Sequence, residues 1–489
     1  METKQKSCLA ILLAALLASS ALASCGDSGT PAVTTSAPDN TKTDTTTEAE
    51  TGPAYKKPDK DFSGQNLNIL IWTDSRFPVE EETGDVINDA VFERNLTVQD
   101  TLGVTFTYDI RPGLVSDYPE WLNVLNASIL AGDDSYQLAG GYGYRLAKDS
   151  LGGNFHNLKT NPYIGFTNPW WPSNIIEAAD LGGQMTLCFE NIDPTYYDVT
   201  YAMYFNKKLA DDYGFENFYD MVKRGTWTID RMTEFAKQAA KDLDGDGVMG
   251  EKDQWGNIGE PLNTYAFMVG CGVAAVKKVD DIPEFDMKNE HFYDAFTKAV
   301  NLNRDDKVTM FSDNFKAADV WADIIDPAFT EGRVLFNTAG LVRVTVFRAM
   351  ETNFGILPLP KYDESQKEYN SMVSIGCANS IAIPATADAE RCGAVIEALS
   401  AEGYYTLTPA YYDIVLKTKN ARDDASSEML DIIFDNRIFD IAYMFDWGGI
   451  IGSINGLKTD GKISSTIDSK LKAAEKELEK TLTAYAELE

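Results

Sequence analysis

The chain has 489 residues, enough for two or more domains, and its 75 acidic residues outnumber 43 basic ones, so the formal net charge is −32. A surface this acidic repels phosphate backbones, which argues against nucleic-acid binding. Only two histidines are present, His156 and His291, and they stand far apart in the sequence. Two distant histidines therefore argue against a histidine-based zinc site and against a Ser-His-Asp triad.

The N-terminus has the pattern of a secretion signal. Lys4 and Lys6 precede an apolar run over residues 9–18, which is too short to span a bilayer comfortably. The sequence Leu22-Ala23-Ser24-Cys25 follows and resembles the bacterial lipobox. We therefore expect a signal peptide over residues 1–24 and lipid attachment at Cys25. Cleavage after Ala23 without lipidation is the alternative.

The pattern of residues 25–61 predicts a disordered linker. Thr, Ser, Asp, Glu and Pro dominate this stretch, so it cannot bury enough apolar surface to offset the entropy cost of ordering. No later stretch is long and apolar enough to cross a bilayer. We expect a folded body that a lipid holds at the extracellular face of a bacterial cell membrane.

The folded body begins with alternating strand and helix patterns. The expected elements are strands over 67–72, 104–108 and 137–139 and helices over 86–102 and 118–130. Gly103 suits the end of the first helix. This alternation predicts parallel strands in an α/β fold, in which ligands lie at the carboxyl ends of the strands.

A second α/β region begins near Thr200. Residues 201–205 suit a strand, and Thr228 suits the N-cap of a helix with Asp230 in its first turn. Residues 467–488 have the apolar stripe of an amphipathic helix. We expect this last helix to pack on the body; binding a partner is the alternative.

Four cysteines follow the linker: Cys188, Cys271, Cys377 and Cys392. None forms a CxxC pair, and spacing alone assigns no disulfide. A chain of this size does not need disulfides to fold, so we expect all four to be free and buried.

Several short motifs follow one another in the order found in one known family. They are residues 202–209, which resemble a YYNK strand and turn; residues 225–228, which resemble a P-x-TW helix start without its Pro; Gln254-Trp255-Gly256; residues 329–336, which resemble an F-x-x-G-x-A-M strand; Gly340, which Leu341 follows in place of the usual Trp; residues 354–360, which match G-x-x-P-x-P; and residues 381–384, which match a late strand. Together, over residues 65–400, they resemble the family 1 extracellular solute-binding proteins of ABC transporters.

The resemblance implies an α/β, two-lobed fold of the periplasmic-binding-protein type (type II), with hinged lobes and discontinuous topology. Lobe I would contain residues 62–195 and 353–400, and lobe II residues 196–352 and 401–489. The implied function is capture of a carbohydrate, mostly an oligosaccharide, by hinge closure, followed by delivery to the transmembrane subunits of an ABC permease. We expect no catalysis and a monomeric protein.

The sharpest motif is an acidic loop over residues 242–253. It matches D-x-D-x-D-G with an acidic residue in the twelfth place, and its expected ligands are the side chains of Asp242, Asp244, Asp246 and Asp253 and the backbone carbonyl of Val248. Carboxylates this close repel one another without a cation. The sequence therefore predicts a structural Ca²⁺ site, with a metal-free acidic turn as the alternative. Asp253 replaces the usual bidentate Glu.

Sugars need aromatic platforms flanked by carboxylates, amides or arginines. The candidate ligand-binding residues are Trp72, Asp74, Tyr142, Tyr144, Trp170, Trp171, Trp255, Trp321, Arg343 and Trp447. Core packing is an equal alternative for each aromatic residue, because Trp is usually well buried.

Two other functions remain open at this point. A surface-anchored carbohydrate-active enzyme would need two carboxylates at a set separation, which 75 acidic residues could supply. A glycan-adhesion module would present a rigid, open platform. Neither has a recognisable motif here.

Overall fold

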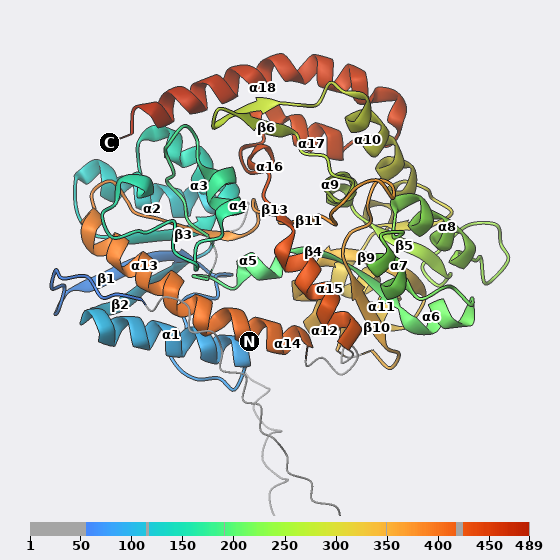
Figure 1. Cartoon of the computed structure of the whole chain (residues 1–489), viewed down its shortest axis with the longest axis horizontal. Helices are drawn as coiled ribbons and strands as arrows, with labels where there is room; N and C mark the ends of the chain where they lie inside the picture. The colour runs from blue at the N-terminus through green and yellow to red at the C-terminus, as the bar shows by residue number, and fades with distance from the viewer. Residues whose placement is uncertain (1–54, 114–116, 190, 349, 417–423, 489) are drawn as a thin grey trace, which may run out of the picture. The chain divides into compact units, whose positions relative to one another are not determined.

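The computed structural model describes residues 55–113, 117–189, 191–348, 350–416 and 424–488 (Figure 1). Its strands form two main sheets, each with its own helices, so this part of the chain is a two-lobed α/β protein. The predicted signal peptide, the lipidation site at Cys25 and nearly all of the linker lie outside the described residues.

The first sheet has the strand order β12–β3–β1–β2. Its strands are β1 (Asn66–Trp72), β2 (Thr105–Arg111), β3 (Leu138–Tyr142) and β12 (Asn379–Ala382). β1 pairs in parallel with β2 and with β3, and β12 is antiparallel to β3. The connections are α1 (Val86–Leu102) and α2 (Tyr118–Ala131). The predicted helices of this region are confirmed to within one residue, whereas the second and third strands each end three residues later than predicted.

Local signals define α1. The side chain of Asp85 accepts hydrogen bonds from the backbone N–H groups of Ile87 and Asn88, at 3.2 and 3.0 Å, which caps the helix. Gly103 ends it in the left-handed conformation, with φ of 70°. α13 (Ala389–Tyr405) and α14 (Leu407–Leu416) pack against α1, although they lie some 300 residues later in the chain.

The second sheet has the order β10–β4–β9–β5–β8. Its strands are β4 (Tyr201–Asn206), β5 (Trp255–Gly259), β8 (Thr309–Phe311), β9 (Val334–Gly340) and β10 (Phe354–Leu357). β4 is antiparallel to β9 and β10, whereas β5 is parallel to β8 and β9. Its helices are α6 (Lys207–Asp212), α7 (Phe218–Arg224), α8 (Ile229–Ala239), α9 (Pro261–Gly270), α10 (Glu290–Asn303), α11 (Asp326–Thr330) and α12 (Val344–Phe347). Thr228 caps α8 as predicted, because its side chain accepts from the N–H of Arg231.

Within the described residues, three segments connect the lobes. They contain α5 (Thr195–Asp198), β11 (Ser371–Met372) and β13 (Arg437–Ile438). β11 pairs in parallel with β13, and Thr200 forms a bridge with Val373. Because the three crossings lie side by side, small changes in their backbone angles can move one lobe against the other.

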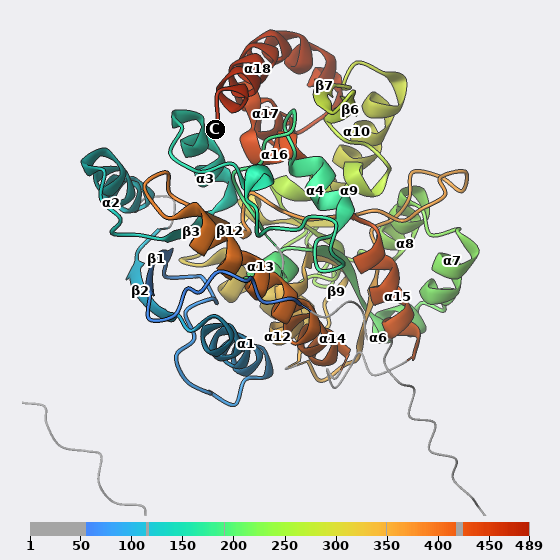
Figure 2. The same ribbon diagram turned by 60° about the vertical axis from the view of Figure 1, so that its left-hand side comes forward.

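The C-terminal part of the chain spans both lobes. α18 (Ile463–Ala486) runs along the top of Figure 1, and both views show α16 (Ile441–Phe445) beside α3 (Gly143–Asp149) (Figure 2). Near one end of α18, Lys288 forms an ion pair with Asp468 at 2.6 Å. Near the other end, the hydroxyl of Tyr485 lies 2.9 Å from Ser150 Oγ and 3.0 Å from Thr186 Oγ1. The helix therefore contacts the first lobe as well as the second.

The exact lobe boundaries remain a prediction, but two segments pack on the lobe opposite to the one expected. β10 falls in the range expected for lobe I, yet it pairs with β4 of the second sheet. Residues 401–416 fall in the range expected for lobe II, yet α13 and α14 pack on α1 of the first lobe. The physical reason is similar in both places. β10 completes its hydrogen bonds on the edge of β4, and α13 and α14 bury their apolar faces against α1.

Replacing Tyr485 with Phe removes a buried hydroxyl and leaves Ser150 and Thr186 without their partner. We expect a loss of about 1–3 kcal/mol in the free energy of unfolding, because each buried group that loses its hydrogen bond keeps its desolvation cost. Urea unfolding followed by circular dichroism measures it. Tyr404→Phe is the control, since Tyr404 is 38% exposed; equal stability of the two variants would contradict the docking described above.

Candidate functional site

The carboxyl ends of β1 and β3 and the start of β12 meet at one edge of the first sheet. Trp72, at the end of β1, donates its indole N–H to Asn379 Oδ1 at 3.0 Å. Its ring packs against the ring of Tyr142, with centroids 4.2 Å apart and planes 43° apart. Trp72 is 4% exposed, so it supports Tyr142, which stays half-exposed. Burial raises the pKa of Tyr142 to about 12, so its hydroxyl is a neutral donor.

A cavity of about 290 Å³ opens beside this edge, between α3 and the segment that contains α16 and α17 (Ile450–Asn455). Its walls include Tyr142, Tyr144 and Arg145 on one side and Tyr443, Asp446 and Asn455 on the other. Since α17 packs on α9 of the second lobe, the cavity lies between the lobes. Two other cavities, of about 310 and 390 Å³, are each lined by residues of one lobe. The cavity between the lobes is therefore the candidate ligand site.

Cys377 also lines this cavity and is exposed, which differs from the expectation that it is buried. The segment that contains it crosses between the lobes just before β12. Cys188, Cys271 and Cys392 are buried as expected, and all four are free.

The second lobe contributes a polar group at the edge of its sheet. The hydroxyl of Tyr201, the first residue of β4, donates to Glu260 Oε1 at 2.9 Å, just beyond β5. Burial raises the pKa of Glu260 above its ordinary value, and the Tyr201 hydroxyl and the positive charge of Arg343 partly oppose this rise. The field of Glu260 also reaches Tyr443 of the cavity wall, whose pKa burial raises well above its ordinary value. The two lobes thus present hydroxyl and carboxylate groups toward the same region.

Arg343 and Trp321, two of the predicted ligand-binding residues, lie together on this lobe. The guanidinium of Arg343 lies 4.5 Å from the centre of the Trp321 ring and donates to Asp326 Oδ2 at 2.7 Å. Trp321 is half-buried, so part of its side chain is exposed. Burial raises the pKa of Asp326, against the charge of Arg343.

Four of the predicted aromatic residues lie in the core instead. Trp170 and Trp171 are 3% and 4% exposed, and their indole N–H groups donate to the two oxygens of Glu397, at 3.0 and 2.7 Å. The N–H of Trp255 donates to Gly250 O at 3.0 Å, and that of Trp447 donates to Thr481 Oγ1 at 2.9 Å. These indoles hold loops and helices together, and none of the four lines the cavity formed by the described residues.

The remaining predicted residues divide between the cavity and its surroundings. Tyr142 and Tyr144 line it, Trp72 lies directly behind Tyr142, and Asp74 is exposed two residues beyond Trp72. Five residues of the candidate site were not predicted from the sequence: Arg145, Tyr201, Glu260, Tyr443 and Asn455. Tyr201 and Glu260 could have been found, because both flank recognisable strands, but nothing in the sequence of residues 443–455 indicates a ligand wall.

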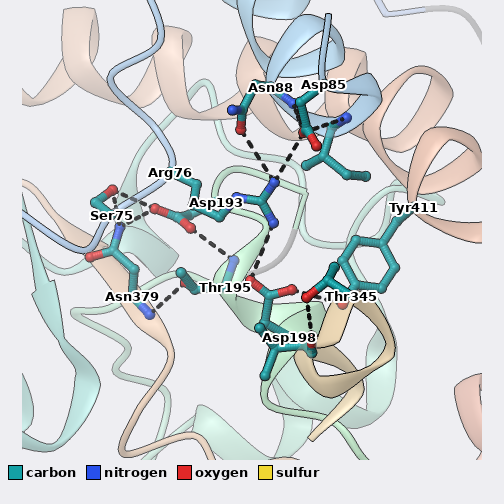
Figure 3. A network of polar contacts seen from close by, with 12 residues as sticks. Ser75, Arg76, Asp85, Asn88, Asp193, Thr195, Asp198, Thr345, Asn379 and Tyr411 are labelled. Carbon is teal, nitrogen blue, oxygen red and sulfur yellow. Dashed lines mark hydrogen bonds and ion pairs between the residues drawn. The ribbon is translucent and has the colours of Figure 1, made fainter. Parts of the chain in front are cut away.

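A network of polar contacts links the first crossing segment to the first lobe (Figure 3). Arg76, after β1, contacts Asp198 Oδ2 at 3.4 Å, and it donates to Asn88 Oδ1 at 3.2 Å. Asp193 accepts hydrogen bonds from Ser75 and from Asn379 Nδ2, the latter at 2.8 Å. The residues beside the cavity edge are therefore tied to the hinge.

The acidic loop lies apart from these groups. One carboxylate oxygen from each of Asp242, Asp244 and Asp246 lies within 4.8 Å of the others. Two oxygens on one Ca²⁺ at about 2.4 Å can be at most about 4.8 Å apart, so this spacing suits the ion. Asp253 is 3% exposed, and its two oxygens accept from the backbone of Leu243 and Gly250, so it closes the loop instead. Three of the predicted carboxylates fit a cation as they stand.

Several solved structures share the fold. An ABC substrate-binding protein from Listeria monocytogenes, solved with cycloalternan, has a TM-score of 0.53 at 13% identity over 86% of this chain and 97% of its own. A sugar transporter from Rhizobium etli, in an open conformation, has a TM-score of 0.55 at 13% identity over 87% and 100%. A solute-binding protein of an ABC transporter from Thermotoga lettingae, bound to α-D-tagatose, has a TM-score of 0.51 at 13% identity over 86% and 100%.

At such low identities the likeness shows the fold alone, which confirms the predicted two-lobed α/β architecture. The three similar proteins are binding or transport proteins by name, and none of them is an enzyme. No protein-family model and no curated protein sequence matches the chain.

Replacing Glu397 with Gln tests the structural role of the two indoles. The carboxylate accepts four hydrogen bonds, from Gly165, Asn168, Trp170 and Trp171, and an amide would turn its NH₂ group toward two of these donors. We expect a loss of about 2–3 kcal/mol in the free energy of unfolding, measured in urea. Glu479→Gln, at an exposed position of α18, should change nothing. A Glu397→Gln variant as stable as the parent would contradict the role assigned to this carboxylate.

Proposed function

We propose that the protein is a substrate-binding protein that captures a carbohydrate between its lobes and delivers it to an ABC importer. The observation that carries the proposal is the cavity between the lobes, whose wall offers three tyrosine side chains together with arginine, aspartate and asparagine side chains. Aromatic faces pack on the apolar C–H faces of sugars, and the polar groups match their hydroxyls. The names of proteins with the same fold support a sugar as the ligand.

Closure of the lobes is the proposed capture step. The cavity is bounded on one side by α3 and on the other by α16 and α17, and three adjacent segments connect the lobes. A ligand that contacts both walls stabilises the closed state by its extra contacts there. Binding without turnover separates this proposal from a surface-anchored enzyme, and compaction on binding separates it from an open adhesion platform.

The proposal places the protein at the outer face of the cell membrane. The lipobox-like sequence that ends at Cys25 supports a lipid anchor, and the Thr- and Ser-rich stretch after it supports a flexible tether. Within the described residues, no helix combines the length and the apolar character that a membrane crossing requires. Delivery to permease subunits and a monomeric state belong to the same proposal.

A panel of soluble saccharides, screened by thermal shift and small-angle scattering, tests the function. At least one sugar should raise the melting temperature and reduce the radius of gyration. Tyr142→Ala should weaken its binding about tenfold or more in calorimetry, because an aromatic platform is worth about 1.5 kcal/mol or more. Tyr404→Ala, at an exposed site of α13, should leave affinity unchanged. Hydrolysis of a sugar, or stabilisation by none of them, would overturn the proposal.

We propose in addition that the acidic loop binds a structural Ca²⁺. Asp242, Asp244 and Asp246 would hold the ion, and the Val248 carbonyl and water would complete the oxygen shell. Asp253 would hold the loop closed from behind. The indole N–H of Trp255, in β5, donates to Gly250 O of the loop. Loss of the ion should therefore also destabilise the sheet.

Chelation with EGTA should lower the melting temperature, since a ligand at a hundred times its Kd stabilises the native state by about 2.7 kcal/mol. Asp244→Asn should lower it in the presence of calcium and remove the response to EGTA. Asp211→Asn, at an exposed site of α6, is the control. An unchanged melting temperature, together with no calcium in elemental analysis, would leave the loop a metal-free turn.

A further inference from the structure

Arg145 stands out in the wall of the cavity between the lobes. It lies on α3 and is half-buried, and its guanidinium carbon is 5.5 Å from the ring centre of Tyr118 and 5.1 Å from that of Tyr144. Among the described residues, no acidic side chain forms an ion pair with it and no acceptor takes its N–H groups. Arg94 and Arg304 also form no ion pair among the described residues, but they donate to backbone carbonyls, whereas Arg145 does not.

Two nearby carboxylates form no ion pair with Arg145 among the described residues. Asp446 lines the same cavity, but its Oδ1 accepts from the backbone N–H groups of Ile451 and Gly452, at 2.9 and 3.2 Å. Asp149 lies one turn further along α3; its Oδ1 accepts from Asn154 Nδ2 at 3.2 Å, and its buried Oδ2 has no hydrogen-bond partner among the described residues. Arg145 lines the cavity, and its five N–H donors have no hydrogen-bond acceptor among the described residues.

Asn455 offers the complementary group from the opposite wall. Its side chain is 8% exposed and lines the cavity, and its Oδ1 has no hydrogen-bond partner among the described residues. Its backbone carbonyl is held by Arg304 at 2.9 Å, which fixes the end of α17. A buried acceptor left without a donor costs free energy, so this oxygen is suited to a ligand hydroxyl.

We propose that the ligand is an acidic sugar, a uronic acid or an oligosaccharide that ends in one, whose carboxylate pairs with Arg145. Closure of the lobes removes water from the cavity, and an arginine without a counter-charge would then be costly. A carboxylate supplies that charge and matches the planar donor fork in two parallel hydrogen bonds. A ring hydroxyl donates to Asn455 Oδ1, and the faces of Tyr142 and Tyr144 take the C–H surface of the ring. This inference rests on the proposed function and names its substrate class.

Matched pairs of saccharides test it by calorimetry at one fixed salt concentration: glucose against glucuronate, galactose against galacturonate, and neutral galactan against galacturonan oligosaccharides. The acidic member of at least one pair should bind ten times more tightly or better. The net charge of −32 disfavours anions in general, so such a preference requires a local cation.

Three variants test whether Arg145 causes the preference for the acidic sugar. Arg145→Gln should weaken binding of the acidic sugar at least tenfold while it changes binding of the neutral partner less than threefold. Asn455→Asp should also weaken the acidic sugar, because it places a negative charge opposite Arg145. Arg231→Gln, at a surface position of α8 whose partners are Glu216 and Glu234, should match the parent in both. Circular dichroism and melting temperatures confirm that each variant folds.

The outcomes separate this inference from the proposed function. Tight binding of neutral sugars with no gain for the acidic partner would overturn the inference and leave sugar capture standing. An acidic preference that survives Arg145→Gln would also overturn it. Failure of every neutral and acidic saccharide to bind would overturn both.

Discussion

Asp198 is a carboxylate buried at the point where the chain passes from the first lobe to the second, and the geometry of the hinge depends on its partners. It is 8% exposed, and burial raises its pKa against the opposing charge of Arg76 and the hydroxyl of Tyr411. Arg76 follows β1, and Tyr411 belongs to α14, which packs on α1. One buried charge thus links a sheet edge, a late helix and the crossing segment. Loss of one partner of such a pair typically costs about 3–5 kcal/mol, because the other charge is left uncompensated.

The same groups would couple the proposed closure of the lobes to the candidate ligand site. The groups that hold the first crossing also hold the cavity edge: Asp193 binds Asn379, and Asn379 accepts the indole N–H of Trp72, on which Tyr142 packs. Movement at the hinge and placement of the ligand platform are therefore mechanically connected. α18 would also restrict movement of the lobes. Its two ends contact different lobes, so any closure has to accommodate that helix.

Much of the fold could be predicted from the sequence because its signals are local. The apolar run of β1, the caps at Asp85, Thr228 and Gly103 and the stripe of α18 depend on neighbouring residues alone. The site was harder, because an indole that packs in the core and one that faces a ligand have the same local pattern. Trp170 and Trp171 looked like a pocket rim, and only Glu397, more than 220 residues later, shows why they are buried. Tyr443 and Asn455 have no local signal, since their importance arises from the placement of α16 and α17 opposite α3.

That placement also indicates where specificity is encoded. The motifs that resemble those of solute-binding proteins lie within residues 65–400, and most of them fall in strands of the two sheets. Half of the cavity wall comes from residues 443–455, beyond those motifs, on a segment held by α9, α10 and α18. A wall carried by a separate C-terminal segment can change its side chains without disturbing either sheet, because its contacts with the sheets are few and its own packing is provided by helices. Arg145 lies on α3, directly after β3, whereas Asn455 lies on this C-terminal segment, so the proposed ligand would contact both parts of the chain.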